Sequence, residues 1–585
     1  MPCPEPPADP DPVSPPTDAA AAPPAPGAVA SSPPGSARAL EARHGDLDHL
    51  AAGAGVLVVG GGITGAGIAL DLAARGARVT LVERGDWAGA TSSASSRLVH
   101  GGLRYLEQLE LGLVREACLE RALLLRNAAG LVWPEAFHVP AFRGDRVGRP
   151  KLVAGLWLYT LLSVPRTLGL PRRRSAAFLQ DVLPDVRTDG LTGGGTYLDA
   201  ATDDGRLTLA LVRTARHLGA TCLARCELEA AEDHGSGVRA RLVDRETRAA
   251  REVDADALVL AGGPGTDHLR ARVTGGDTAG GRPWTRPSRG SHLVLPRARL
   301  PTDGAVIFTS AVDGRVMFLI PWPRHTIVGT TDLDHDPAER PRATGAEVRY
   351  LLDSADALAP GAGLTTDDVV STWSGLRPLL ASTTANPSER SREERIERTG
   401  PRTWTIAGGK LTGYRAAAEE VGARVCRALD LGRAGRRSPT RDLALVGALG
   451  GRVPRPAWSR LTDDGRPRDL DPRGIAWDAR YGARAAEVRR VCAGTSEGAR
   501  ALDPATWLGE VDHAARQEDC LDLASFVFRR TDLGLVAPDV AAAEAEALAA
   551  RLGELLGWDA DRRAAEVSAV RAELAHRAAW RDDPA

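Results

Sequence analysis

"VLVVGGGITGAGIALDLAARGARVTLVERG", residues 56–85, decides the fold of this chain. Residues 56–60 are apolar and rich in valine, which is typical of a short buried strand. Residues 64–76 have the composition of a helix that ends at a glycine, and residues 78–83 again resemble a buried strand. A strand, a glycine-rich turn, a helix and a second strand predict a Rossmann-like α/β domain.

Three glycines in this stretch, Gly60, Gly62 and Gly65, form G-x-G-x-x-G between the strand and the helix. Gly60 permits the tight turn, Gly62 lets the backbone approach a pyrophosphate, and the helix N-terminus offers N–H groups to phosphate oxygens. Glu83 ends the second strand, where a carboxylate can accept hydrogen bonds from ribose hydroxyls. The sequence therefore predicts a site for an adenine dinucleotide.

A second glycine-rich segment, "TIAGGKLTGYRAAAEEV" at 405–421, repeats the order of strand, glycines and helix. The N-terminus of such a helix would stabilise the negative charge that a flavin acquires on reduction. Between the two segments, "GATSSASSRLVHGGLRYLE" at 89–107 is small and hydroxylated, so its backbone can pass close to a flat ring. Two glycine-opened helices facing one cofactor favour FAD over NAD.

The composition is that of an ordinary globular protein of more than one domain, with 585 residues and a net charge of -2. This charge provides no global field for nucleic acid, and we predict none as a partner. The seven cysteines are scattered without C-x-x-C spacing, which argues against disulfides, zinc and iron–sulfur clusters. We predict no metal and a reducing, cytoplasmic environment.

The segments divide the chain into three parts. Residues 1–50 predict a disordered Pro/Ala-rich leader without the basic and apolar parts of a signal peptide, and order is expected near residue 54. Residues 51–445 predict interleaved FAD-binding parts (about 54–105, 195–268 and 400–430) and substrate-binding parts (about 106–194 and 280–399). Residues 455–585 predict a helical domain. The fold class is thus α/β, with a Rossmann-like FAD domain, a mixed-sheet substrate domain and an all-helical C-terminal domain.

Residues 106–190 have a helical pattern with proline-rich joins, and strands are expected beyond them. Their most apolar run, 152–165, is too short to span a bilayer. Because Lys151 and Arg166 flank this run, a helix in the membrane interface is one interpretation. A buried helix is the favoured one.

Several motifs together resemble the FAD-dependent (aerobic type) glycerol-3-phosphate dehydrogenase family, within the D-amino-acid-oxidase-like flavoproteins. They include "TSSASSRLVHGGLRYLE" at 91–107, "IAGGKLTGYR" at 406–415 and "RQEDCLDLASFVFRRT" at 516–531. The resemblance implies oxidation of sn-glycerol 3-phosphate to dihydroxyacetone phosphate, with a hydride passing to flavin N5 and electrons passing on to a membrane quinone. It also implies peripheral attachment to the cytoplasmic face of the cell membrane, and the chain could form a homodimer.

Residue by residue, the resemblance and the glycine-rich patterns assign a site. The cofactor-binding residues expected are Gly60, Gly62, Gly65, Glu83, Thr91, Ser92, Ser93, His100, Gly101, Gly102, Gly408, Gly409, Lys410, Leu411 and Thr412. The substrate-binding residues expected are Arg104, Tyr105, Arg377, Arg392 and Lys410, with His292, Arg377 and Lys410 as the catalytic set.

The expected residue types suit a phosphorylated alcohol, because a phosphate dianion requires several cations. Lys410 is one of only two lysines among 74 basic residues, which singles it out. His292 could take the hydroxyl proton, since an imidazole titrates near neutrality. Each residue also has a structural interpretation: Arg392 lies in a charge run typical of a solvated face, and His292 could be a structural hydrogen-bonding residue.

Three other positions carry weaker hypotheses. The run Thr330–Asp332 could order a loop near the flavin ring or cap a turn. Gly265 and Arg289 replace residue types that the family often has, an aromatic side chain and a lysine respectively. The C-terminal pair Arg529 and Arg530 is interpreted as structural.

Three alternatives remain open at this level. One is a glycerol-3-phosphate oxidase that uses O2 with the same site. Another is an amine or amino-acid oxidase of the same superfamily, which would need one arginine for a carboxylate rather than a cluster of cations. The third is a non-catalytic FAD-binding protein, against which the set Arg104, His292, Arg377 and Lys410 argues.

Overall fold

The quoted stretch folds as predicted in the computed structural model of the chain. Strand β1 (Val56–Val59) leads into helix α2 (Ile63–Ala74), and β2 (Val79–Glu83) returns parallel to β1. The structure describes residues 43, 47, 50, 53–106, 109–164, 166–274, 282–382, 393–431, 437–450, 456, 460 and 472–584, apart from the side chains of 104 and 472–476.

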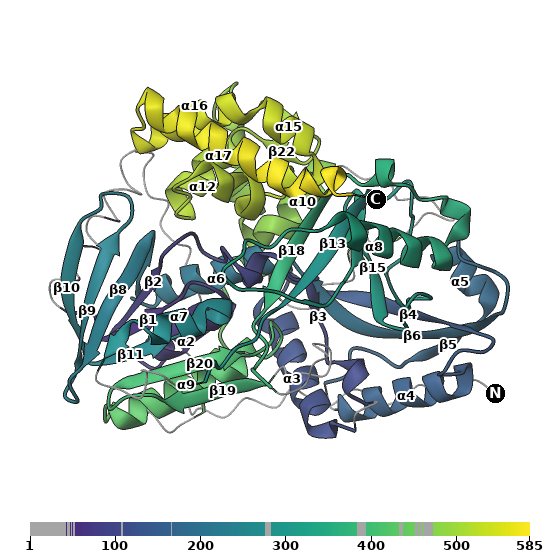
Figure 1. Ribbon diagram of the computed structural model, residues 1–585, viewed down its shortest axis with the longest axis horizontal. Helices are drawn as coiled ribbons and strands as arrows, with labels where there is room; N and C mark the ends of the chain where they lie inside the picture. Colours follow the sequence, from purple (N-terminus) through teal and green to yellow (C-terminus); the bar gives the residue numbers. More distant parts are fainter. Residues whose placement is uncertain are drawn as a thin grey trace, which may run out of the picture. The chain divides into compact units, whose positions relative to one another are not determined.

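A six-stranded sheet contains β1 at its centre and is parallel except at the edge strand β19 (Figure 1). Its spatial order is β19 (Glu394–Arg398), β20 (Thr403–Gly408), β11 (Ala257–Leu260), β1, β2 and β7 (Thr221–Ala224). Alternate residues of β1 face opposite sides: Val56 and Val58 pack in the core formed with the helices, whereas Leu57 and Val59 pack in a second core. The central strand is therefore buried on both faces, as its apolar run predicts.

The second core lies between this sheet and a four-stranded sheet. That sheet has the order β10 (Ala250–Ala255), β9 (Val238–Asp244), β8 (Cys226–Asp233) and β12 (Val273–Thr274). The helices on the opposite side of the six-stranded sheet are α2, α6 (Asp204–His217) and α9 (Tyr414–Ala428). Three layers thus enclose the two glycine-rich turns.

Three residues of the predicted leader belong to the folded protein. Arg43 is buried, donates to the Ala224 carbonyl at 2.6 Å and pairs with Asp244 at 2.5 Å. Leu47 and Leu50 are buried in the second core. Packing therefore begins before residue 54, because apolar and charged partners of these residues lie far along the chain. The other residues of the predicted leader lie outside the described residues.

A large mixed sheet forms the other half of the α/β region. In spatial order it comprises β17 (Leu333–Asp334), β13 (Ser288–Pro296), β16 (His325–Gly329), β15 (Val316–Trp322), β14 (Ala305–Thr309), β4 (Val132–Phe142), β6 (Leu191–Thr202) and β3 (Leu98–Val99), with β18 (Ser371–Arg377) paired to β13 and β5 (Arg172–Arg174) paired to β6. Strand β4 corrects the prediction that 106–190 is helical. Pro134 and Pro140 disfavour a helix there, and the strand pairs with β6 along its whole length.

The remaining helices of this region are α3 (Leu111–Asn127), α4 (Arg149–Leu162), α5 (Ala176–Val182), α7 (Thr266–Arg270) and α8 (Gly345–Leu358). Helix α4 contains the apolar run that we expected to be a buried helix, and the structure contradicts this for one face. Leu156 and Tyr159 are buried, whereas Trp157 and Leu161 are 50% and 67% exposed. The apolar run is therefore two-sided, with one side in the core and one in contact with solvent.

The C-terminal region is helical, as predicted, apart from one short hairpin. Its elements are α10 (Pro472–Tyr481), α11 (Ala485–Ala493), β21 (Ala501–Asp503), β22 (Thr506–Trp507), α12 (Glu510–Gln517), α13 (Leu523–Ser525), the π-helical turn η11 (Phe526–Arg530), α14 (Leu533–Val536), α15 (Pro538–Ala543), α16 (Ala545–Leu556) and α17 (Ala560–Ala578). The hairpin forms because the Asp503 side chain accepts from the Ala505 N–H and closes a tight turn.

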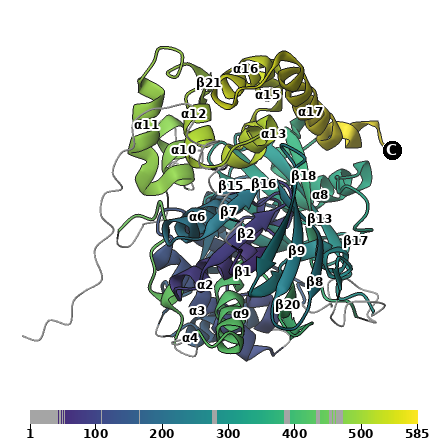
Figure 2. The ribbon, with the colours of Figure 1, turned by 90° about the vertical axis from the view of Figure 1, so that its left-hand side faces the viewer.

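Figures 1 and 2 show these helices gathered on one side of the α/β region, with α2 and α9 on the other side of β1 and β2. Phe526, Leu548 and Val570 from the helices share a hydrophobic core with Trp133 and Val294 from the mixed sheet. The C-terminal helices are therefore packed against the α/β region through buried apolar side chains.

Candidate active site

The first glycine turn is shaped by close backbone approach. Gly60 has φ +119°, and a Cβ there would lie 2.3 Å from the Ala261 carbonyl oxygen. A Cβ on Gly65 would lie 1.8 Å from the Gly60 carbonyl oxygen. A side chain at Gly60 would push the turn away from the backbone that follows β11, and one at Gly65 would push it away from helix α2, whose N-cap is Gly62. The turn thus presents backbone N–H groups and a helix N-terminus to one point, which suits a pyrophosphate.

Glu83 is held at the end of β2 by backbone donors. Its two carboxylate oxygens accept hydrogen bonds from the Gly61 and Gly85 N–H groups, each at 2.7 Å. Burial raises the pKa of this carboxyl, and the two N–H donors oppose the shift. Each oxygen keeps a lone pair, so Glu83 can accept hydroxyl groups of a ribose beside the turn.

The hydroxylated segment after the turn connects the start of helix α2 to strand β18 of the large mixed sheet. Ser92 Oγ accepts from the Ile63 N–H at 2.9 Å, at the start of α2. Thr91 Oγ1 donates to the Leu376 carbonyl at 2.6 Å, on strand β18. Ser93 Oγ instead donates back to the Ala88 carbonyl at 2.7 Å and does not line the cavity described below.

The second glycine turn follows β20 and precedes α9. Gly408 and Gly409 have φ +80° and +90°, and a Cβ on Gly408 would lie 2.3 Å from the Glu393 carbonyl oxygen. After the turn, the Lys410 ammonium lies 4.1 Å from the centroid of the Tyr105 ring. This separation is a cation–π contact, and it connects the second glycine turn to the 100–106 segment.

The 100–106 segment is fixed by hydrogen bonds at its start. His100 Nδ1 accepts from the Gly102 N–H at 3.1 Å, and the Gly101 N–H donates to the Tyr159 hydroxyl at 2.9 Å. Tyr159 in turn donates to the buried Asp199 carboxylate at 2.9 Å. Arg104 belongs to the short 3-10 helix η3 (Leu103–Leu106), and its side chain lies outside the described residues.

Arg377, at the end of β18, is held by the 330–332 segment. Its guanidinium donates to the Asp332 carboxylate at 3.1 Å, to Thr330 Oγ1 at 3.0 Å and to the Thr331 carbonyl at 3.1 Å. The guanidinium lies over Gly290, where a Cβ would be 2.3 Å from it. The run Thr330–Asp332 therefore positions an arginine, a role the sequence did not indicate.

His292 on β13 is almost fully buried and stacks on Trp373, with the ring centroids 4.7 Å apart. Its Nε2 lies 2.8 Å from Ser96 Oγ. Burial lowers the pKa of His292 to about 3, and the nearby guanidinium groups of Arg377 and Arg97 act in the same direction. The imidazole is therefore neutral at neutral pH, and it titrates well below the near-neutral range expected from the sequence.

One cavity of about 2310 Å³ joins these groups. We name its two ends by their residues, the Glu83 end and the Arg377 end. Of the predicted site residues, it is lined by Gly60, Gly62, Glu83, Thr91, Ser92, His100, Gly102, Tyr105, His292, Arg377, Gly408, Gly409, Lys410, Leu411 and Thr412. Gly65 and Gly101 pack behind it, and Arg392 lies outside the described residues. Both lysines of the chain, Lys151 and Lys410, line this cavity.

Sequence reasoning missed a buried carboxylate behind the Arg377 end. Glu347 on α8 accepts from Ser291 Oγ at 2.8 Å, from Thr331 Oγ1 at 2.7 Å and from Arg289 at 2.8 Å. Arg289, noted as a departure from the family pattern, thus pairs with Glu347. No spacing pattern indicated this contact, because α8 is far in sequence from β13.

The cavity fits a flavin dinucleotide. The Glu83 end provides an acceptor for ribose hydroxyls and a glycine turn. Any side chain at Gly60 would fill the space at this turn. The second glycine turn, with its two left-handed glycines, leaves the backbone open toward the same cavity. The fold and the site thus define a flavoprotein, in which Gly60, Gly62, Glu83 and the 408–412 turn would hold FAD.

Comparisons with known proteins agree. Residues 55–427 match the family described as "FAD dependent oxidoreductase", and residues 438–563 match the "C-terminal domain of alpha-glycerophosphate oxidase". The chain belongs to the FAD dependent oxidoreductase family. FAD is its cofactor, and both the predicted resemblance and the predicted fold class are confirmed.

The individual relatives reported next are all named as glycerol-3-phosphate dehydrogenases. An aerobic glycerol-3-phosphate dehydrogenase of Staphylococcus aureus (strain USA300) is 37% identical over 369 residues, which cover 63% of this chain and 66% of that protein. The protein from strain MRSA252 has the same identity and coverage. The chain thus spans just under two thirds of the length of these relatives. The glycerol-3-phosphate dehydrogenase from Bacillus halodurans, solved with FAD, has a TM-score of 0.72 and 29% identity and covers 92% of this chain and 98% of its own.

Two further predictions concern metals and membranes. The described residues contain no cluster of histidine, cysteine and acidic groups that could hold a metal ion, and the six described cysteines are buried and form no disulfide. Within the same residues, no helix has both the length and the apolar character needed to cross a membrane.

Proposed function

We propose that the chain oxidises sn-glycerol 3-phosphate to dihydroxyacetone phosphate. One observation supports the proposal most strongly: Arg377, Lys410 and a neutral His292 line the same cavity as the two glycine turns. The names of the relatives and of the C-terminal match support the same substrate.

The phosphate would be bound by cations at the Arg377 end. The Arg377 guanidinium is preorganised by three acceptors, and a guanidinium at the cavity wall suits phosphate oxygens in charge and shape. Lys410 adds a compact charge whose position is restrained by the Tyr105 ring. We propose Arg104 and Arg392 as further phosphate ligands on the basis of the family pattern alone.

The hydroxyl proton would be taken by His292. The contact with Ser96 Oγ fixes the ring orientation, and the negative charge of a bound phosphate would raise the low pKa of His292 toward the range of a base. FAD, when bound, would supply the acceptor for the hydride that leaves the substrate carbon. Stacking on Trp373 keeps the imidazole plane fixed while the proton moves.

We retain the predicted domain division as part of this proposal. Residues 51–445 would supply the interleaved FAD and substrate parts, and residues 455–585 the C-terminal domain. The site residues named above come entirely from the first of these.

The electron acceptor is proposed to be a membrane quinone, reached from the cytoplasmic face. The exposed side of α4 and the residues after it carry five exposed apolar side chains, Trp157, Leu158, Leu161, Val164 and Leu170. Strand β5 next to it is made of three arginines. Exposed apolar side chains beside basic residues suit the surface of an anionic bilayer, and Leu158 also lines the cavity.

The membrane proposal is tested by flotation with vesicles that contain anionic lipids. We expect the double variant Trp157→Ser/Leu161→Ser to float less than the parent chain. Val312→Ser, which changes an exposed side chain on the β14–β15 turn, serves as the control. Equal flotation of the double variant and the parent would contradict the proposal.

A second candidate acceptor is O2, favoured by the match of 438–563 to the C-terminal domain of an oxidase. The peroxide yield of the purified protein, turning over glycerol 3-phosphate in air without added quinone, separates the two. A stoichiometric yield would select the oxidase.

The substrate proposal is tested by anaerobic titration followed by visible absorbance. Addition of sn-glycerol 3-phosphate should bleach the flavin band. Bleaching by an amine or amino acid instead, with none by glycerol 3-phosphate, would overturn the proposal.

A further inference from the structure

The segment that follows Glu83 is tied to the C-terminal helices by buried charge pairs. Asp86 accepts from both terminal nitrogens of Arg530 at 2.7 Å and from Arg529 Nε at 2.5 Å. Asp86 and Arg530 are 6% and 1% exposed, and the guanidinium groups hold the pKa of the Asp86 carboxyl well below its ordinary value. A bidentate, buried pair of this kind fixes both segments relative to each other.

A second contact reaches the glycine turn itself. The Trp87 indole N–H donates to the Asp519 carboxylate at 2.9 Å. The Trp87 ring packs directly on Gly61, where a Cβ would lie 2.5 Å from the ring. Gly61 is also the residue whose N–H donates to Glu83. Asp519 therefore restrains, through one indole ring, the backbone that would hold the pyrophosphate and ribose.

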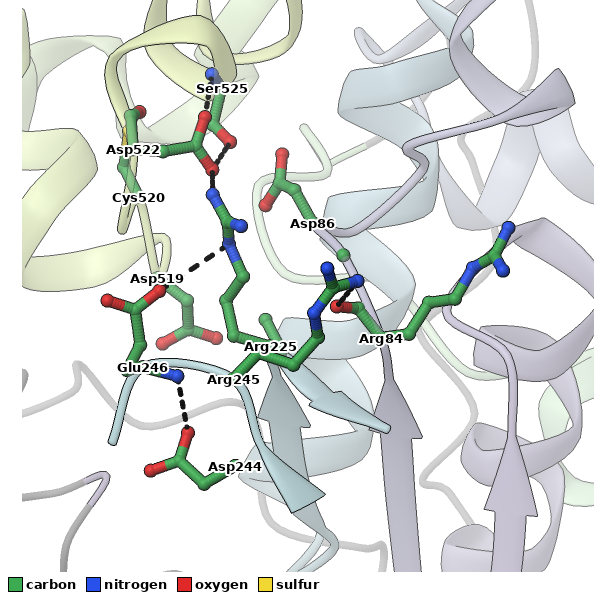
Figure 3. Close-up of polar contacts among 12 residues, drawn as sticks. Arg84, Asp86, Arg225, Asp244, Arg245, Glu246, Asp519, Cys520, Asp522 and Ser525 are labelled. Atoms are coloured by element: carbon green, nitrogen blue, oxygen red, sulfur yellow. Dashed lines mark hydrogen bonds and ion pairs between the residues drawn. The ribbon is translucent and has the colours of Figure 1, made fainter. Parts of the chain in front are cut away.

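A third contact closes the same end from the side. Arg225, on the turn between β7 and β8, donates to Asp522 at 2.5 Å (Figure 3). The backbone N–H of Arg225 donates to the Gly85 carbonyl at 2.8 Å. Asp522 and Arg529 line the cavity at the Glu83 end. We call residues 518–530 the clamp segment: it contacts the 83–87 segment directly at Asp86 and Trp87, and indirectly through Arg225.

We propose that the clamp segment positions the FAD-binding turn, so that retention of FAD depends on the docking of the C-terminal helices. Asp86, Trp87, Asp519 and Arg530 are positioning residues in this arrangement. The coupling concerns FAD retention and holds whichever alcohol the flavin oxidises. By linkage, FAD binding must also stabilise the docking of the clamp segment by the same factor.

The test measures the FAD dissociation constant of the apoprotein by quenching of flavin fluorescence. Arg530→Gln should weaken FAD binding by about 5- to 150-fold, the usual range of coupling between two sites. The matched control is Arg551→Gln, which breaks a bidentate pair with Asp512 within the C-terminal helices. The control should bind FAD as the parent does, even where it lowers the melting temperature equally.

A gentler variant covers the case in which Arg530→Gln fails to fold. Trp87→Phe removes the indole N–H and keeps an aromatic ring against Gly61, so it should weaken FAD binding by about 2- to 10-fold. Hydrogen exchange gives the reciprocal readout, since amides of 526–531 should exchange more slowly in the FAD-loaded protein. Unchanged FAD affinity in both variants despite a lower melting temperature, or equal exchange with and without FAD, would overturn the proposal.

Discussion

The two ends of the cavity bind charge in different ways. At the Glu83 end, a carboxylate is held by two backbone N–H groups, one from Gly85 and one from Gly61 at the other end of the same strand–helix–strand unit. At the Arg377 end, a guanidinium is held by side chains and a carbonyl from 330–332, near a histidine from β13, and a lysine from a separate turn lines the same cavity. The first end depends on local backbone geometry, whereas the second depends on the packing of distant segments. Substitutions at the second end should therefore impair the chemistry more than the binding of FAD.

The largest effect is expected at the Arg377 end. Arg377→Ala and Lys410→Ala should each lower kcat/KM by about 3–4 kcal/mol of transition-state stabilisation, because each removes a preorganised charge. FAD content should stay near that of the parent in Arg377→Ala. Arg239→Ala, which removes an exposed guanidinium on β9, is the control. Parent-like kcat/KM in both variants would contradict the proposed roles.

A smaller effect is expected at the Glu83 end, and on a different quantity. Glu83→Gln should weaken FAD binding by about 2 kcal/mol, since an amide keeps only one acceptor for the two N–H donors. Enzyme saturated with FAD should keep most of its kcat. Glu229→Gln, on the exposed edge of β8, is the control. Loss of kcat without loss of FAD affinity would contradict the claim that the Glu83 end acts on FAD binding rather than on the chemistry.

The last effect, similar in size to that of Glu83→Gln, is a pH dependence of stability from His292. Its folded pKa of about 3 lies below the ordinary value of 6.5, so the unfolded chain binds more protons between these values. Stability should therefore fall as the pH drops below about 6.5. Between about pH 7 and pH 5 this one group should cost about 2 kcal/mol.

Denaturant unfolding at the two pH values measures this effect. The His292→Gln variant should lose about 2 kcal/mol less than the parent on the same acidification. His234→Gln, an exposed histidine, should behave as the parent. An identical loss in His292→Gln and the parent would show that His292 is not held neutral.

The Glu83 end could be predicted from the sequence because its residues belong to one continuous unit of the chain. Gly60, Gly62 and Glu83 lie within one strand–helix–strand unit, and strict backbone geometry restricts their residue types. Lys410 could be singled out because lysine is so rare in this chain. The glycines before it marked the second turn for the same physical reason as the first.

The supporting contacts could not be predicted in this way. The pair of Asp86 and Arg530 joins residues 444 positions apart, and Arg530 was interpreted as structural because nothing local indicated its partner. Glu347 also joins distant segments, and its capping box at the start of α8 gives no sign of the contact with Thr331. The exposed face of α4 was missed because an apolar run alone does not show which side packs.

The most direct test of the account is the ratio of kcat/KM for sn-glycerol 3-phosphate to that for glycerol, in the parent and in Arg377→Met. The account predicts a large preference for the phosphorylated alcohol in the parent, and a much smaller ratio in the variant with glycerol turnover nearly unchanged. A ratio near one in the parent, or an unchanged ratio in Arg377→Met, would contradict the claim that fixed cations beside the flavin site select a phosphate.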